Sequence, residues 1–278
     1  MLQLLLTLVL AVPAAPDLRA EVGAAFAEAV DRADSRVETE ERLRGLRAAA
    51  AEAASRLEGQ RVALLIEEAV LDARWRALVD PYAAAEELAE RLAALASDLR
   101  FEPLMEADLP PGFPEPTPVH ELRLVEYPGY RLAFAELEGA GDGSAFFELF
   151  RHIQSNGIAM TAPVEVTFEA ERLEPVRMAF LYEGPDQGAV GSAGEVEVVD
   201  VPPQSVLSLG CRGRDSLARV ERMWALLEDW LEDHPEWEAD GPPRTMGYNS
   251  PMVPSARRCF EVQVPVRRVE PADELREA

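Results

Sequence analysis

Residues 151–166 read RHIQSNGIAMTAPVEV, and seven consecutive residues within them, 158 to 164, carry no charge. This run stands out in a chain of which 28% is charged. Methionine, threonine and alanine suit a strand that is enclosed on both faces, where a charge would be costly. Because proline cannot donate to a strand ladder, Pro163 restricts such a strand to a sheet edge or a bulge. The stretch therefore predicts an enclosed strand that follows a helix.

The preceding helix is predicted over residues 143–154, and its core face has the i, i+3, i+4, i+7 spacing. The residues of that face are Phe146, Leu149, Phe150 and Ile153. His152 lies about 110° from the centre of the face at 100° per residue. A histidine at such a boundary is either a partly solvated surface group or a metal ligand on the wall of a cleft. The pattern alone favours the surface group.

From residue 119 onward, short runs rich in Val, Leu, Phe and Tyr alternate with Gly and Pro, which is typical of strands. An internal repeat runs through this region: Val125-Glu126-Tyr127-Pro128 lines up with Val199-Asp200-Val201-Pro202, and Leu132 with Val206. Each half reads strand, strand, helix, strand, strand. The predicted class is α+β, with a pseudo-twofold repeat of two βαββ-like halves. They would form a distorted antiparallel sheet or barrel with two helices, preceded by an α-helical N-terminal segment.

The N-terminal helical segment is predicted over residues 18–100, which are rich in Ala, Leu, Arg and Glu. Gly59 is placed to end one helix, and Asp80-Pro81 reads as an N-cap with proline at the first position of another. Three helices with narrow apolar stripes indicate an antiparallel bundle or a coiled coil. Self-association through these helices is one expectation, and burial of the stripes within one chain is the other.

Residues 101–118 are predicted to be a proline-rich linker, since six prolines fall within residues 103–118. So many prolines exclude helix and sheet interiors and favour a stiff, extended connector. The boundary between the helical segment and the domain at 119–268 belongs here.

Residues 1–14 resemble a signal peptide, with a 12-residue, largely apolar run that ends at Val12 and is followed by Pro13 and Ala14. This run is too short to span a bilayer, so no integral membrane segment is expected in the mature chain. Export to the periplasm is the favoured location, and a buried N-terminal helix in a cytoplasmic protein is the alternative. Residues 269–278 are expected to form an acidic tail.

Composition excludes several functions. A formal net charge of −24 disfavours nucleic acid as a partner, and all 27 basic residues are arginine, which excludes Schiff-base chemistry. No nucleophile elbow or zinc-ligand spacing is present, so no enzyme activity is expected. The two cysteines, Cys211 and Cys259, are expected to be buried free thiols, although they could pair in an exported chain.

The segment LFRHIQSNGIAMTAPVEV, residues 149–166, resembles the helix-to-strand signature of the SOUL haem-binding protein family. In that family an aromatic-rich helix ending Leu-Phe-x-Tyr-Ile leads into Ile-x-Met-Thr-Ala-Pro-Val. GYNSPMVPSARRCFEVQV, residues 247–264, is similar to the family's Tyr-x-x-Pro turn and final strand. The resemblance covers residues from about 120 to 268. His152 stands where the family has a tyrosine.

This resemblance implies a non-enzymatic protein that binds haem or another tetrapyrrole in an apolar cleft between the two halves. The macrocycle would lie against Phe147 and Met160, with Arg151 available to a propionate. His152 could then provide an axial ligand to the haem iron. The alternative is an interaction or assembly protein whose SOUL-like domain binds another hydrophobic or effector-like small molecule.

Overall fold

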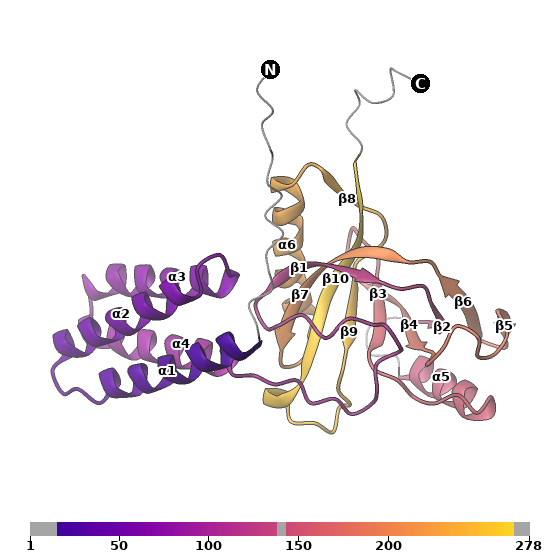
Figure 1. The fold of residues 1–278 in the computed structure, drawn as a ribbon, viewed down its shortest axis with the longest axis horizontal. Coiled ribbons are helices and arrows are strands. Elements are labelled where there is room, and N and C mark those ends of the chain that lie inside the picture. Colours follow the sequence, from indigo (N-terminus) through magenta and orange to yellow (C-terminus); the bar gives the residue numbers. More distant parts are fainter. Residues whose placement is uncertain (1–15, 138–142, 270–278) are drawn as a thin grey trace, which may run out of the picture. The chain divides into compact units, whose positions relative to one another are not determined.

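The computed structural model describes residues 16–137 and 143–269 (Figure 1). The chain divides after Glu102 into two compact units, which we call the helical unit and the β unit. The signal peptide predicted at residues 1–14 and all but the first residue of the acidic tail predicted at residues 269–278 lie outside the described residues.

Four helices build the described part of the helical unit: α1 (Pro16–Asp34), α2 (Thr39–Arg56), α3 (Arg61–Ala77) and α4 (Pro81–Leu99). The predicted helical N-terminal segment is therefore confirmed, but the prediction of three helices is wrong. The chain turns between α1 and α2, where the sequence analysis assumed one continuous helix. Asp80 caps α4 as predicted, because its Oδ1 accepts a hydrogen bond from the Ala83 amide at 3.0 Å.

The core of the helical unit is almost entirely apolar, and about half of its buried residues are alanine. Small side chains let the helices approach closely: a Cβ added to Gly23 of α1 would lie 2.8 Å from the Leu99 Cβ of α4. Leu46, Leu88 and Leu92 fill the space between the helices and are fully buried. None of the helices within the described ranges is long and apolar enough to cross a membrane.

The β unit contains a ten-stranded antiparallel sheet and two α-helices, so the predicted α+β class is confirmed (Figure 1). The strand order is β1-β7-β10-β9-β3-β4-β2-β6-β5, with β8 paired to β10. The strands are β1 (Leu122–Tyr127), β2 (Tyr130–Glu136), β3 (Val164–Phe168), β4 (Pro175–Leu181), β5 (Gly191–Ala193), β6 (Val196–Val201), β7 (Gln204–Arg212), β8 (Trp237–Ala239), β9 (Arg244–Gly247) and β10 (Cys259–Arg268). The helices are α5 (Ser144–Ser155), α6 (Leu217–Asp233) and the 3-10 helix η1 (Ser255–Arg257).

The strand register contains the pseudo-twofold repeat that the sequence predicts. Val125 of β1 pairs with Val206 of β7, and Val199 of β6 pairs with Leu132 of β2. In the sequence repeat Val125 corresponds to Val199 and Leu132 to Val206, so these two pairs are equivalent. The first strand of each half therefore pairs with the second strand of the other half.

Both α5 and α6 pack on the same face of the sheet. Val164 of β3 contacts the buried cluster under α5, whereas Val166 and Phe168 of the same strand belong to the cluster with α6. Side chains alternate along a strand, so Glu165 and Thr167 point to the opposite face. We call this opposite face the helix-free face.

The proline-rich segment, residues 103–118, belongs to the β unit. The Asn249 side chain donates to the Leu104 carbonyl at 2.6 Å, and the Ala162 amide donates to the Asp108 carbonyl at 3.0 Å. The segment is extended, as its prolines require, but it is hydrogen-bonded to the sheet unit along its length.

The uncharged run was predicted to be an enclosed strand, but residues 158–163 form a loop, mostly buried, and β3 begins only at Val164. Ile158 and Ala162 are buried, and the Thr161 hydroxyl donates to the Leu181 carbonyl at 2.6 Å. Pro163 immediately precedes β3, which lies between β9 and β4 in the interior of the sheet. The expectation of an edge strand or a bulge at Pro163 is therefore wrong, because proline at the entrance of a strand removes no ladder hydrogen bond.

Cys211 and Cys259 are buried free thiols, although they lie on the adjacent strands β7 and β10. Cys211 packs in the cluster under α6. The Cys259 amide donates to Asn249 Oδ1 at 2.8 Å. Burial raises the pKa of the Cys259 thiol to about 12, so this thiol is protonated at neutral pH.

Candidate functional site

Helix α5 is anchored to the sheet by three buried residues one turn apart, Ala145, Leu149 and Ile153. Phe146 is partly buried and packs beside them. Phe150, which the sequence analysis placed on the core face, lies at its margin and is 37% exposed. The core face of α5 is therefore rotated slightly away from Phe150.

The outward face of α5 carries an aromatic surface, which we define as Phe147, Phe150 and Arg151. The Phe147 ring is 64% exposed, and Phe150 stacks on Phe146 with 6.2 Å between ring centroids. Arg151 lies one turn after Phe147, and its Nε donates to the Phe147 carbonyl at 3.2 Å. The structure thus brings two of the predicted site residues, Phe147 and Arg151, together.

His152 faces a different side of α5. At 100° per residue it lies about 140° from Phe147 around the helix. Its Nε2 is hydrogen-bonded to the Tyr182 hydroxyl at 2.8 Å, and Tyr182 itself is almost fully buried. Burial lowers the pKa of His152, so the imidazole is neutral at pH 7. The predicted ligand is therefore neutral, as metal coordination requires, but it is turned away from Phe147.

Met160, the fourth predicted site residue, lies in the buried loop before β3. It is partly buried and packs against the cluster under α5, which includes Phe180 and Ile153. It therefore supports α5 from beneath, whereas Phe147 faces outward.

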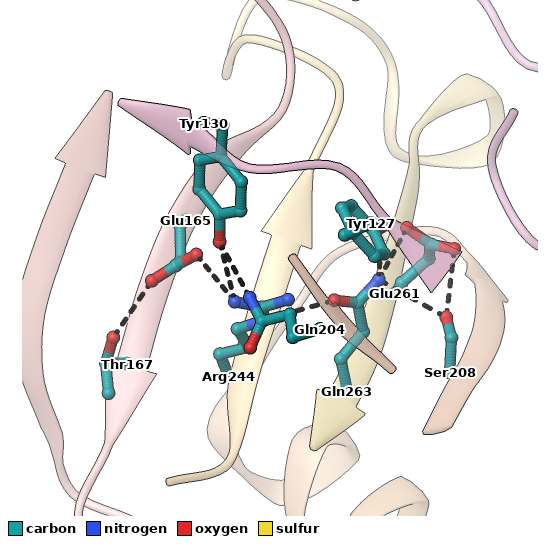
Figure 2. Close-up of polar contacts among 9 residues, drawn as sticks. All are labelled: Tyr127, Tyr130, Glu165, Thr167, Gln204, Ser208, Arg244, Glu261 and Gln263. Atoms are coloured by element: carbon teal, nitrogen blue, oxygen red, sulfur yellow. Dashed lines mark hydrogen bonds and ion pairs between the residues drawn. The ribbon is translucent and has the colours of Figure 1, made fainter. Parts of the chain in front are cut away.

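A buried polar cluster lies on the helix-free face (Figure 2). Arg244 of β9 is paired with Glu165 of β3, with 3.2 Å between Nη1 and Oε2. The Arg244 Nη1 also donates to the Tyr130 hydroxyl at 3.0 Å, and its Nε donates to Gln263 Oε1 at 3.1 Å. The Arg244 Nη2 is buried without a hydrogen-bond partner among the described residues. Arg244 thus connects β2, β3 and β10.

Glu261 of β10 forms the second half of the cluster and is 2% exposed. Its Oε1 accepts from the Thr117 amide at 2.8 Å and from the Ser208 hydroxyl at 2.9 Å. Its Oε2 accepts from Gln263 Nε2 at 3.1 Å and from the Tyr248 hydroxyl. Hydrogen-bond donors thus replace the water that this carboxylate loses on burial.

The proline-rich segment covers part of this cluster. The Phe113 ring contacts the edges or faces of Tyr127 and Tyr130, with 5.1 Å between centroids in each pair. Burial raises the pKa of Tyr130 to about 12 and raises that of Tyr127 as well, so both phenols stay protonated at neutral pH. Within the described ranges, no group of three His, Cys, Asp or Glu residues could hold a metal ion.

The sequence analysis assigned no role to Glu165, Arg244, Glu261 or Gln263. Glu165 lies in VEVTF, and Glu261 and Gln263 lie in FEVQV; this alternation is typical of strands with one solvated face. Arg244 begins the short strand RTMG, which has no such alternation. One feature of the sequence could have pointed to this region. Phe113 in the proline-rich segment is an aromatic residue that needs a surface to pack on, which indicates that the segment covers part of the sheet.

A model of the SOUL heme-binding protein family matches residues 116–265 of the chain. This match confirms the resemblance found in the segments at 149–166 and 247–264. No curated protein matches the chain.

Among solved structures, the chain is similar to the C-terminal domain of EcmrR, with 19% identity and a TM-score of 0.41 over 54% of this chain and 98% of that chain. It is also similar to a hydrolase from Listeria innocua, with 13% identity and a TM-score of 0.42 over 54% of this chain and 94% of that one. A third similar structure is SAV2435 bound to tetraphenylphosphonium, with 11% identity and a TM-score of 0.33 over 56% and 98% of the two chains. None is similar enough to transfer a role to a residue here.

Proposed function

Since the chain belongs to the SOUL heme-binding protein family, we propose that its β unit binds haem or a related tetrapyrrole without catalysing a reaction. The observation that carries the proposal is the aromatic surface of α5. Phe147 is 64% exposed, although water contact of a phenylalanine ring is unfavourable. A flat apolar macrocycle would cover this ring.

Arg151 supplies the charge that such a ligand needs. The chain has a formal net charge of −24, which would repel the propionates of haem over most of the surface. Arg151 projects from the same face of α5 as Phe147, one turn later, so a macrocycle on Phe147 would have a guanidinium within reach of a propionate.

His152 offers a second mode of binding. A histidine that ligates a metal usually holds its other ring nitrogen in a hydrogen bond. The bond to Tyr182 uses Nε2, so Nδ1 would be the ligating nitrogen. Because His152 and Phe147 lie on different sides of α5, a macrocycle stacked on Phe147 would not be ligated by His152. We assign binding to the aromatic surface and treat ligation as the competing mode.

Titration with haemin, followed through the Soret band, tests the proposal. The wild-type chain is expected to shift the band, and Phe147→Ala is expected to weaken the affinity at least tenfold, which corresponds to about 1.4 kcal/mol. Arg151→Ala should weaken binding less. His152→Ala should leave the spectrum of the complex unchanged. Met252→Ala is the matched control, because Met252 is 89% exposed and lies in the loop between β9 and β10.

Two results would contradict the proposal. A wild-type chain that leaves the Soret band unshifted does not bind haemin. If His152→Ala abolishes the shift while Phe147→Ala leaves the affinity unaltered, the ligand is held by coordination and the aromatic surface has no part in binding. Melting curves of each variant separate these effects from unfolding.

A further inference from the structure

The hydrogen bonds that hold the proline-rich segment on the β unit leave one gap, residues 109–116. Before the gap, the Asp108 carbonyl accepts from the amide of the buried Ala162 at 3.0 Å. After the gap, the Thr117 amide donates to the carboxylate of the buried Glu261 at 2.8 Å. Each end is therefore fixed to a buried group, and we call residues 109–116 between them the flap.

The flap makes no hydrogen bond to the sheet. Four of its eight residues are proline, which has no amide to donate. Among the described residues, the only hydrogen bond of the flap is internal, where the Phe113 amide donates to the Pro110 carbonyl at 3.0 Å. Gly112 completes this turn with a φ of 81°. The flap can therefore leave the sheet as one piece without breaking a hydrogen bond to it.

Packing alone holds the flap on the helix-free face. Pro110 is buried, and the partly buried Phe113 packs against the small apolar cluster of this face. The Phe113 ring also makes T-shaped contacts with Tyr127 and Tyr130, with 5.1 Å between centroids in each pair. Apolar contacts of this kind can separate and form again without a change in the sheet, because they are not directional.

A buried donor lies against these two tyrosines. The Arg244 Cζ lies 5.6 Å from the Tyr127 ring centroid, and the Arg244 Nη1 donates to the Tyr130 hydroxyl. Arg244 is 5% exposed, and its Nη2 has no hydrogen-bond partner within the described ranges. The closed flap buries the Phe113 ring, which is favourable, but it leaves this donor without an acceptor, which is unfavourable. The two effects are similar in size, so the closed and open states lie close in free energy.

We propose that the flap is a lid over the helix-free face and that Phe113 is the latch that keeps it closed. In the open state the flap rotates about Asp108 and Thr117, and water or a small solute with an acceptor oxygen reaches Arg244 Nη2. The sheet stays intact, because no strand of the sheet passes through the flap. The lid does not depend on the haem site proposed on α5, since α5 covers the other face of the sheet.

Nitration of the full chain with tetranitromethane, located by peptide mass spectrometry, tests the lid. The reagent modifies tyrosines that solvent reaches, and two other tyrosines provide references. Tyr82 is 64% exposed and should react fastest, whereas Tyr182 is buried on the α5 side and should react only when the β unit unfolds. Tyr130 is 3% exposed and should react at a rate between these two, because the lid opens without unfolding.

Low concentrations of urea separate opening from unfolding. Opening of the lid exposes little surface, so the nitration rate of Tyr130 should depend only weakly on urea, whereas that of Tyr182 should rise steeply. Phe113→Ala removes the latch and should raise the Tyr130 rate at least about tenfold while its dependence on urea stays weak. Phe113→Leu keeps part of the apolar contact and should give an intermediate rate.

Phe147→Ala is the matched control, because it removes an exposed aromatic ring from α5 and should leave the Tyr130 rate unchanged. A Tyr130 rate that equals the Tyr182 rate and rises as steeply with urea overturns the proposal, since the face then opens only when the β unit unfolds. A Tyr130 rate that Phe113→Ala leaves unaltered, or that Phe147→Ala raises as much, overturns it as well, because Phe113 is then not the latch.

Discussion

The two units of the chain bury their interiors in different ways. The helical unit packs alanine and leucine between four helices, and its buried Arg19 is hydrogen-bonded to an uncharged side chain, Gln60. The β unit has its larger apolar clusters where α5 and α6 cover the sheet, and a smaller one on the helix-free face around Leu132 and Leu181. On the helix-free face it buries Arg244, Glu165 and Glu261.

This difference has an energetic consequence. Contacts between apolar side chains are non-directional, so an apolar core tolerates substitutions that conserve its volume. A buried ion pair depends on its geometry, and the loss of one partner leaves the other charge without compensation. The β unit should therefore respond more strongly to a single substitution than the helical unit, and the following predictions test this contrast.

The largest effect is expected for Arg244→Leu. This change leaves Glu165 buried without its cation and removes the donor to Tyr130, so the β unit should lose about 4 kcal/mol of unfolding free energy. Denaturant titration followed by tryptophan fluorescence measures the loss. Arg177→Leu is the control, because Arg177 pairs with Glu136 at an exposed site and should cost less than about 1 kcal/mol. Equal costs for the two variants would show that burial does not make the Arg244–Glu165 pair more sensitive than an exposed pair, and the reason given for the contrast would be wrong.

A smaller effect is expected for Leu92→Ala in the helical unit. Leu92 is fully buried, and its truncation should destabilise the bundle by about 3 kcal/mol through the cavity that it leaves. Thermal unfolding followed by far-UV circular dichroism measures this. Val37→Ala, at a position 99% exposed between α1 and α2, should be close to neutral. If Leu92→Ala leaves the unfolding free energy unchanged, the helices must move together to fill the cavity. The inference that this truncation leaves a cavity would then be wrong.

The smallest effect of a single side chain is the contribution of Tyr130 to a loss of stability at high pH in the β unit. Burial raises the pKa of Tyr130 to about 12, whereas an unfolded tyrosine titrates near 10. The unfolded state therefore loses this proton first, and stability present below pH 10 falls as the pH rises to about 12. Tyr130 alone contributes about 2 kcal/mol to this loss, and Tyr127 shifts in the same direction.

Urea titrations at pH 8 and near pH 11.5 measure this loss. Tyr82 of the helical unit is 64% exposed, so the bundle provides an internal reference. Tyr130→Phe should reduce the pH dependence of the β unit. Parallel loss of both units would instead indicate general repulsion in a strongly acidic chain.

The sequence predicts the order of elements better than it predicts the helix-free face. Local patterns identify α5 and α6, the cap at Asp80 and the repeat in which Val125 corresponds to Val199. They fail for β5 and β8, which are only three residues long, and for the break between α1 and α2. These elements depend on tertiary contacts more than on local preference.

The buried polar cluster could not be predicted because its partners are far apart in the sequence. Glu165 and Arg244 meet only because β3 and β9 are adjacent at the centre of the sheet. The cover over the cluster comes from Phe113, in a segment whose composition predicts a connector. For His152, the helical pattern predicts a boundary position, but the hydroxyl that holds its ring comes from Tyr182, which directly follows β4.

The exchange of first strands between the two halves also limits how this chain can be divided or built. A fragment that ends after β4 leaves β1 without β7, β2 without β6 and β3 without β9, so three strands expose unpaired backbone groups. During synthesis on the ribosome, β1 and β2 therefore cannot complete their pairing until β6 and β7 have been synthesised. Two copies of one half could recover pairings for β1 and β2 only if β1 of each copy paired with β2 of the other. The β unit is thus a single cooperative unit, although its sequence contains an internal repeat.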